Sequence, residues 1–172
     1  MPYKYYCLLY ISPMVFLLDQ VTKWIVREQI PRGNAVAIIP GYVDLVHVMN
    51  TGAAFGFMAG PYAGWRTPFF LGIAAIALIG LLWIMRRCPA QERLLPLIFS
   101  LVIGGILGNG LDRLRLGAVV DFISCHWRDA TVDLTAGGWR LAFPLEWPAF
   151  NVADSAITVS MVLLSWQLLR KR

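Results

Sequence analysis

Four long apolar segments alternate along the chain with more polar connections. These segments lie at about Tyr5–Val26, Thr67–Met85, Leu94–Leu111 and Ala149–Leu169. Each is close to the roughly 20 helical residues that cross a hydrocarbon core of about 30 Å. The pattern predicts one membrane-embedded domain over residues 1–172, with four transmembrane helices and outer connections at about 27–66 and 112–148.

The outer connections have a different periodicity. After the Pro40-Gly41 turn, Tyr42–Met49 alternates and is rich in β-branched residues, which is typical of a strand, and Val36–Ile39 offers a partner. In the second connection, Gly137-Gly138 predicts a turn between two short extended runs. We therefore expect an all-α membrane protein with a small extracytoplasmic β-sheet and a surface flap.

Composition agrees with a membrane protein. Of the 172 residues, 58% are hydrophobic and only 15% are charged, whereas charged residues make up about a quarter of a soluble domain. The cysteines, Cys7, Cys88 and Cys125, are few and scattered, so neither a disulfide framework nor a metal site is expected.

Basic residues predict the orientation. Seven of the fifteen lie in three very short segments: Lys4, Arg86, Arg87, Arg93, Arg170, Lys171 and Arg172. By the positive-inside rule, both termini and the loop between the second and third spans are cytoplasmic. The net charge of +5 thus reflects topology and contact with the lipid bilayer, and no nucleic-acid partner is expected.

Polar residues gather near the outer ends of three spans. They are Asp19, Lys23, Asn109, Asp112, Arg113, Asn151 and Asp154. Charge in hydrocarbon is costly, and intramembrane acids mark functional sites by default. Such groups persist at membrane depth where they line a water-accessible cavity or are buried in protein. The sequence therefore predicts a polar site near the outer membrane face.

The motifs of common hydrolases are missing. The chain has no Gly-x-Ser-x-Gly and no His-Glu-x-x-His, and its two histidines, His47 and His126, lie outside the spans. What remains is a carboxylate pair, Asp121 and Asp154. Two acids about 3 Å apart cannot both ionise, so one activates water while the other protonates the substrate. An aspartic protease that needs no metal or other cofactor is our hypothesis.

Other interpretations stay open. Asp121 could be a solvated loop acid, and Asp154 with Asn151 could cap the fourth helix. A small transporter is a rival function, although transporters usually hold their site near the midplane. A non-catalytic assembly protein would explain the aromatic connections and the small-residue pair Gly104 and Gly108.

Two charge pairs also have structural interpretations. Asp112 and Arg113 could form an ion pair or extend toward the membrane surface. Asp19 and Lys23 fit an i,i+4 pair on one helix face.

Five ordered segments carry most of these residues: Asp19–Lys23, Asn50–Gly56, Gly108–Arg113, Val120–Phe122 and Phe150–Ser155. They resemble the motifs of the lipoprotein signal peptidase family, also called signal peptidase II. The resemblance spans nearly the whole chain. It implies a bacterial inner-membrane aspartic endopeptidase that removes the signal peptide from diacylglyceryl-modified prolipoproteins, cleaves on the N-terminal side of the lipidated cysteine, and is blocked by globomycin.

When the functional positions of the family's motifs are matched to this sequence, the resemblance implies that Asp121 and Asp154 are the catalytic dyad. The substrate-binding or supporting positions are then Asn151, Asn109, Asp112, Arg113, Asn50, Asp19 and Lys23. We expect a monomer whose site lies near the periplasmic face. The 33 positions from Asp121 to Asp154 exceed the expected family spacing, and Arg128–Leu145 could form a larger flap.

Overall fold

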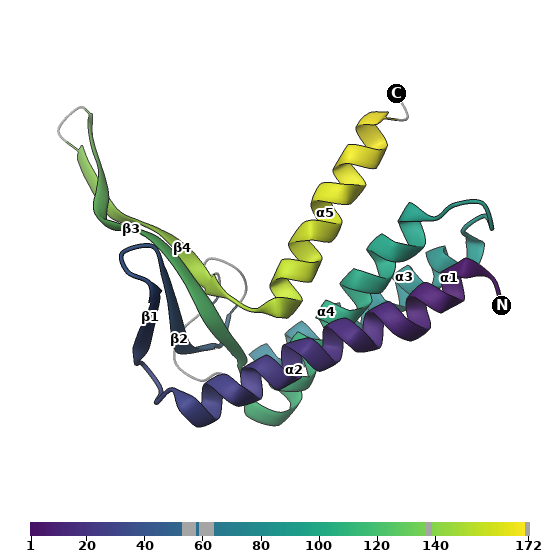
Figure 1. Ribbon diagram of the computed structural model, residues 1–172, viewed down its shortest axis with the longest axis horizontal. Helices are drawn as coiled ribbons and strands as arrows, with labels where there is room; N and C mark the ends of the chain where they lie inside the picture. Colours follow the sequence, from purple (N-terminus) through teal and green to yellow (C-terminus); the bar gives the residue numbers. More distant parts are fainter. Residues whose placement is uncertain (53–57, 59–63, 137–138, 171–172) are drawn as a thin grey trace.

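The computed structural model describes residues 1–52, 58, 64–136 and 139–170 (Figure 1). The first helical rod comprises α1 (Tyr3–Tyr6), the π-helical η1 (Cys7–Ile11) and α2 (Ser12–Gln29). The π turn ends at Ile11, two positions before Pro13, which lacks a backbone N–H and whose ring would clash with a carbonyl of a regular helix.

In the described part of the chain, three helices are long and apolar enough to cross a membrane. They are α3 (Arg66–Arg87), α4 (Leu94–Leu116) and α5 (Val152–Arg170). Large side chains on α3 face outward, as shown by Ile76 and Ile79, which are 74% and 69% exposed. A surface of this kind suits contact with acyl chains. The first rod does not reach the same hydropathy, because α2 carries four charged residues.

Helix α4 is the centre of the helical part, since it contacts α2, α3 and α5. Its glycines permit this close packing. A Cβ at Gly104 would lie 2.8 Å from the carbonyl oxygen of Ser12, and one at Gly105 would lie 2.7 Å from that of Ala153. A Cβ at Gly108 would collide with the Asp19 carboxylate. These small residues allow α2 and α5 to pack closely against α4.

The expectation of an all-α fold is wrong, because the chain has mixed α and β structure. Strands β1 (Ala35–Ile39), β2 (Val43–Asn50), β3 (Val119–Ala136) and β4 (Trp139–Phe150) form one antiparallel sheet in that order. The first two strands confirm the predicted pair.

The second connection forms much longer strands than the two short runs expected, because pairing between β3 and β4 resumes beyond a bulge after His126. The predicted turn at Gly137-Gly138 lies outside the described residues, as do positions 53–56 of the Asn50–Gly56 segment.

The sheet is fixed to the end of the first helical rod. Phe122 of β3 packs against Val26 and Ile30, and the ring Nδ1 of buried His47 lies 2.8 Å from the carbonyl oxygen of Ile30. Neighbouring side chains on a strand point to opposite faces. Anchoring Phe122 against α2 therefore turns the adjacent Asp121 toward α4 and α5.

Candidate active site

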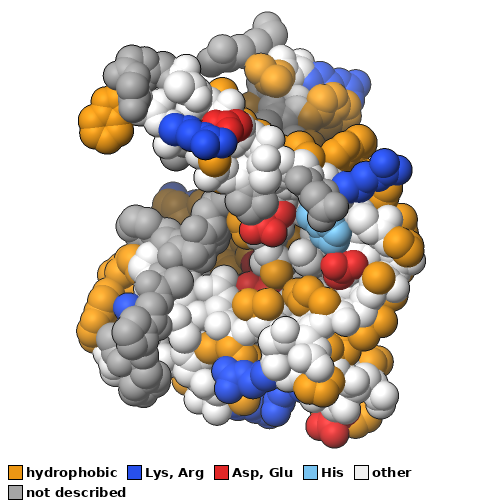
Figure 2. Space-filling view, turned by 90° about the vertical axis from the view of Figure 1, so that its left-hand side faces the viewer, with side chains coloured by type: hydrophobic (Ala, Val, Ile, Leu, Met, Phe, Trp, Pro, Cys, Tyr) orange, Lys and Arg blue, Asp and Glu red, His pale blue; other side chains and the backbone are white. Residues whose placement is uncertain are grey.

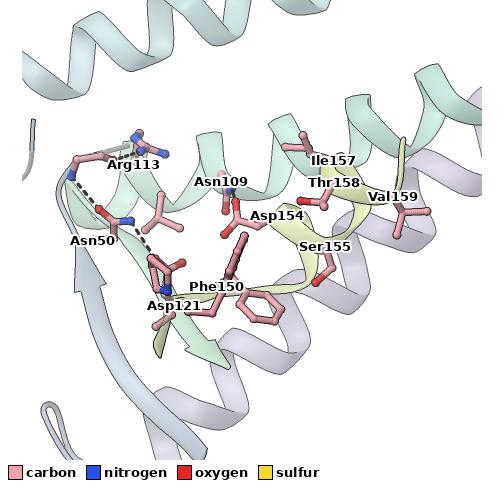
Figure 3. Close-up of a pocket in the computed structure, with 15 residues that line it drawn as sticks. Asn50, Asn109, Arg113, Asp121, Phe150, Asp154, Ser155, Ile157, Thr158 and Val159 are labelled. Atoms are coloured by element: carbon pink, nitrogen blue, oxygen red, sulfur yellow. Dashed lines mark hydrogen bonds between the residues drawn. The ribbon is translucent and has the colours of Figure 1, made fainter. Parts of the chain in front are cut away.

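A cavity of about 620 Å³ lies between the sheet and the adjoining ends of α4 and α5 (Figure 3). Five of the predicted site residues line it: Asn50, Asn109, Arg113, Asp121 and Asp154. Viewed from the side of the sheet, Figure 2 shows a recess with acidic side chains beside it. The structure thus brings together groups from β2, β3, α4 and α5 that are far apart in sequence.

Asp121 is buried, with 2% of its surface exposed, and is not the solvated loop acid of the alternative interpretation. Its Oδ2 accepts a hydrogen bond from Asn50 Nδ2 at 3.0 Å, and its Oδ1 accepts one from Asn151 Nδ2 at 2.8 Å. Burial raises the pKa of Asp121 to about 6, opposed by the Asn50 hydrogen bond and reinforced by the charge of Asp154. This carboxyl can therefore hold a proton near neutral pH.

Asp154 lies in the first turn of α5 and forms a reciprocal cap with Asn151. The Asp154 N–H donates to Asn151 Oδ1 at 2.9 Å, and the Asn151 N–H donates to Asp154 Oδ2 at 3.3 Å. The predicted capping role is confirmed. Asp154 also lines the cavity, where its Oδ1 accepts a hydrogen bond from Asn109 Nδ2 at 2.8 Å.

Asn109 connects the cavity to a buried lysine. Its Oδ1 accepts hydrogen bonds from Lys23 Nζ at 2.8 Å and from Asn151 Nδ2 at 3.1 Å. Since the oxygen already faces two donors, the amide nitrogen must face Asp154. An N–H donor directed at a carboxylate stabilises its ionised form.

Lys23 lies behind the cavity between two carboxylates. Its Nζ is 2.8 Å from Asp19 Oδ2 and 2.9 Å from Asp112 Oδ2, and all three side chains are at least 95% buried. The carboxylates also accept backbone hydrogen bonds, Asp19 from Ala153 at 2.9 Å and Asp112 from Val120 at 3.1 Å. This charged cluster fixes the starts of α5 and β3 against α2 and α4. The predicted i,i+4 pair of Asp19 and Lys23 is confirmed.

Arg113 faces the cavity, away from the buried lysine. Its Nη2 donates to the carbonyl oxygen of Gly52 at 2.6 Å, and its guanidinium carbon lies 4.5 Å from the ring centroid of Phe70. The suggested ion pair with Asp112 is therefore wrong, because Asp112 binds Lys23 instead. Arg113 contributes a positive charge to the cavity wall.

Sequence reasoning assigned no role to Gln20. Its Nε2 lies 3.2 Å from Asp19 Oδ2, 3.1 Å from the carbonyl oxygen of Gly108 and 3.1 Å from Asp112 Oδ1. The available signal was its place in the Asp19–Lys23 segment. The aromatic wall that Trp147 and Phe150 contribute was also missed, because it depends on where β4 ends.

Comparisons with known proteins agree with this arrangement. The family model described as signal peptidase (SPase) II matches residues 11–170. The lipoprotein signal peptidase of Azoarcus sp. (strain BH72) is 43% identical over 162 residues, covering 94% of this chain and 82% of that protein. The one from Syntrophotalea carbinolica is 38% identical over 157 residues, covering 91% and 87%.

Solved structures show the same likeness. A bacterial membrane enzyme determined in meso at 2.3 Å resolution is 31% identical, with a TM-score of 0.74 and coverage of 94% of this chain and 87% of that one. A second, at 1.9 Å, is 30% identical, with a TM-score of 0.69 and coverage of 95% and 93%. From the family match and these relatives, the chain belongs to the signal peptidase II family, whose members are bacterial multi-pass membrane aspartic peptidases.

Proposed function

We propose that this signal peptidase II removes signal peptides from diacylglyceryl-modified prolipoproteins, with Asp121 and Asp154 as the catalytic dyad. The observation that carries the proposal is that both carboxylates line one cavity but have different hydrogen-bonding environments. Cleavage falls on the N-terminal side of the lipidated cysteine. No metal or other cofactor takes part, because two carboxyl groups suffice to activate water.

The surroundings assign a role to each acid. Asp154 lies at the N-terminus of α5, and its oxygens accept hydrogen bonds from the Asn109 amide and the Asn151 N–H, so we assign it the role of base. Asp121 is buried with a pKa of about 6 and supplies the protonated carboxyl. Asp154 takes a proton from water as the oxygen attacks the scissile carbonyl, and Asp121 protonates the carbonyl oxygen. When the C–N bond breaks, the proton on Asp154 passes to the leaving amine, and a hydroxyl of the tetrahedral intermediate returns its proton to Asp121 as the carbonyl re-forms.

Asn50, Asn151 and Asn109 hold the two acids in these positions, and Arg113 offers a donor to the peptide substrate. Asp19, Lys23 and Asp112 support the site from behind. On the α5 side the cavity wall includes the apolar residues Ile157 and Val159. Such a wall suits a substrate whose scissile bond lies beside acyl chains and arrives sideways from the bilayer.

The proposed topology has four spans in the inner membrane, both termini in the cytoplasm and the site near the periplasmic face. Both termini lie at the helix ends away from the sheet (Figure 1). The basic residues Lys4, Arg86 and Arg87 are at that same end, where Lys4 Nζ donates to the carbonyl oxygen of Arg86 at 2.7 Å. We expect the 172 residues to act as one domain and as a monomer.

The test uses purified protein in lipid and a precursor with or without its diacylglyceryl group. Asp121→Asn and Asp154→Asn should each reduce cleavage of the lipidated precursor at least 10²–10⁴-fold, roughly the value of general acid–base catalysis. Asp44→Asn, which changes a half-buried acid on β2 outside the cavity lining, is the matched control. Near-normal turnover by a folded dyad variant would remove that residue from the mechanism, and equal cleavage of both precursors would refute the lipid requirement.

A further inference from the structure

The β3–β4 hairpin extends well beyond the rest of the sheet. Strand β2 pairs with β3 only as far as Cys125, opposite Val43. Beyond the bulge, the two remaining strands pair by themselves from Thr131, opposite position 144, to the turn. We call residues 131–136 and 139–144 the distal ribbon. Figure 1 shows it reaching past β1 and β2.

The register of the distal ribbon separates apolar from polar residues. Val132 lies opposite Phe143, and position 136 lies opposite Trp139. Because opposite residues share a face and neighbours alternate, Val132, Leu134, Trp139 and Phe143 lie on one face. The other face carries Thr131, Asp133, Thr135, Arg140 and Ala142.

An ion pair marks the polar face. Arg140 Nε lies 3.1 Å and 3.0 Å from the two carboxylate oxygens of Asp133. The two residues are diagonal neighbours, since Asp133 lies opposite Ala142 and Arg140 lies opposite Thr135. A charged pair on one face and four large apolar residues on the other make the distal ribbon amphipathic.

The apolar face is uncovered. Leu134 is 56% exposed, Phe143 42% and Trp139 84%. A two-stranded ribbon is marginally stable in water by itself and needs a surface on which to bury an apolar face. Among the described elements, β3 makes its main contacts with β2, β4, α2 and α4, and its pairing with β2 ends at Cys125, before the distal ribbon. The apolar face of the distal ribbon therefore requires another surface.

The root of the hairpin indicates which surface this is. Two residues separate the end of α4 from the start of β3, and one residue separates the end of β4 from the start of α5. Both helices are span candidates, so both ends of the hairpin are held at the level where the chain leaves the membrane. The ribbon departs sideways from these helix ends instead of continuing along their axes (Figure 1). A ribbon with this origin and direction runs along the bilayer surface.

Aromatic residues fit the same location. Trp127 and Trp147, near the root, are 59% and 58% exposed, and Trp139 lies at the far end. Tryptophan is enriched at membrane–water interfaces, where its ring is apolar and its N–H reaches polar groups. Tryptophans along the whole length of the hairpin favour a lipid surface over a protein partner that covers one end.

We propose that the distal ribbon lies in the headgroup region of the phospholipid bilayer. Val132, Leu134, Trp139 and Phe143 face the acyl chains, and the Asp133–Arg140 pair faces water. The same hairpin supplies Trp147 to the wall of the active-site cavity. The enzyme thereby holds a lipid-bound ribbon beside the place where a lipidated substrate arrives. The proposal depends on the membrane location of α4 and α5 and not on the roles of Asp121 and Asp154.

The test is a spin-label scan of the full chain in phosphatidylcholine–phosphatidylglycerol vesicles. Single cysteines replace Thr131, Val132, Asp133, Leu134 and Thr135 in a Cys125→Ala background. The buried Cys7 and Cys88 are retained, and the background protein measures their labelling. Each labelled protein is accepted if its Tm matches that of the background protein, and its cleavage of a lipidated precursor is measured separately, so a failure of the proposed function is distinguished from a failure of the proposal.

Labels at positions 132 and 134 should be relaxed more by oxygen than by a water-soluble nickel chelate, and those at 131, 133 and 135 should show the reverse. Access of the chelate to all five positions would overturn the proposal, because the ribbon would then project into water. The alternation in oxygen and chelate access could also disappear when the protein is diluted in lipid. That result would overturn the proposal, because a second copy of the chain, and not lipid, would then cover the apolar face.

Discussion

The side-chain nitrogen of Asn109 donates to Asp154 Oδ1 at 2.8 Å, while its side-chain oxygen accepts from Lys23 and Asn151. The buried lysine therefore determines which end of the amide meets the acid. The charge of Lys23 orients the neutral Asn109 amide, and this amide in turn orients the Asp154 carboxylate. This relationship links the helix α2 to the cavity without direct contact between Lys23 and Asp154.

Removing this amide should impair turnover more than stability. A hydrogen bond to a charged group is worth about 1.5–3 kcal/mol, so Asn109→Ala should lower kcat/KM for a lipidated precursor roughly 10- to 100-fold. The measurement is cleavage kinetics in lipid vesicles, with Asn34→Ala, at an exposed position, as the control. A loss confined to KM would indicate that Asn109 binds substrate and does not position Asp154.

The pKa of Asp121 predicts how stability varies with pH. Its folded pKa is raised from 3.8 to about 6, so the folded state favours the protonated acid. Protonated Asp121 therefore adds to the free energy of unfolding. This contribution is fully present below pH 4 and is lost as the pH rises through 6. Asp121→Asn should therefore gain stability over the natural chain between pH 4 and pH 7, by up to roughly 3 kcal/mol.

Thermal unfolding in detergent at pH 4, 5, 6 and 7 measures this difference. Asp44→Asn serves as the control, since it removes an acid outside the cavity lining. A gap between Asp121→Asn and the natural chain that stays constant with pH would contradict a raised pKa.

The buried charged cluster predicts a large loss of stability when Lys23 is neutralised. Lys23→Met leaves Asp19 and Asp112 without their cation, and breaking a buried pair costs about 3–5 kcal/mol. We expect a lower yield of folded protein and a lower Tm. The triple variant Lys23→Met/Asp19→Asn/Asp112→Asn, which removes the charges together, should recover part of the loss. A Lys23→Met protein as stable as the natural chain would refute the cluster's structural role.

The packing of α4 against α5 can be tested with two glycines on one helix. A Cβ at Gly105 would lie 2.7 Å from the carbonyl oxygen of Ala153, a backbone atom that cannot turn aside. Gly105→Ala should therefore lower Tm. At Gly110 no atom lies within 4 Å, so Gly110→Ala should be neutral or stabilising by about 0.5–1 kcal/mol through helix propensity. Equal effects of the two substitutions would contradict close contact between the helices.

The sequence predicted those parts of the fold that depend on residues close together in the chain. The apolar segments, the strands β1 and β2 and the pair of Asp19 with Lys23 each depend on residues within one turn or one strand. The partner of Asp112 could not be obtained in this way. Arg113 is its neighbour in sequence, but consecutive residues do not face each other on a helix. Lys23 reaches Asp112 only through the packing of α2 against α4.

The length of the hairpin and the burial of Asp121 also depend on distant contacts. Strand β3 continues past an irregular stretch because β4 pairs with it again from Thr131 onward. Asp121 is buried because Phe122, on the other face of β3, is held by α2. The residues alone offered the two acids as a carboxylate pair, the resemblance to a family made them a catalytic dyad, and that assignment stays a prediction.

The cap that Asp154 forms with Asn151 has a consequence for thermal inactivation. On the proposed roles, the same carboxylate activates water and completes the first turn of α5. Fraying of that turn and loss of the catalytic base are therefore one event. Ala153 in the same turn is buried and held by Asp19, so the turn should open only when α5 separates from α2 and α4, and heating should abolish cleavage as the helical bundle melts. Thermal inactivation of this enzyme should then coincide with the loss of its helix packing.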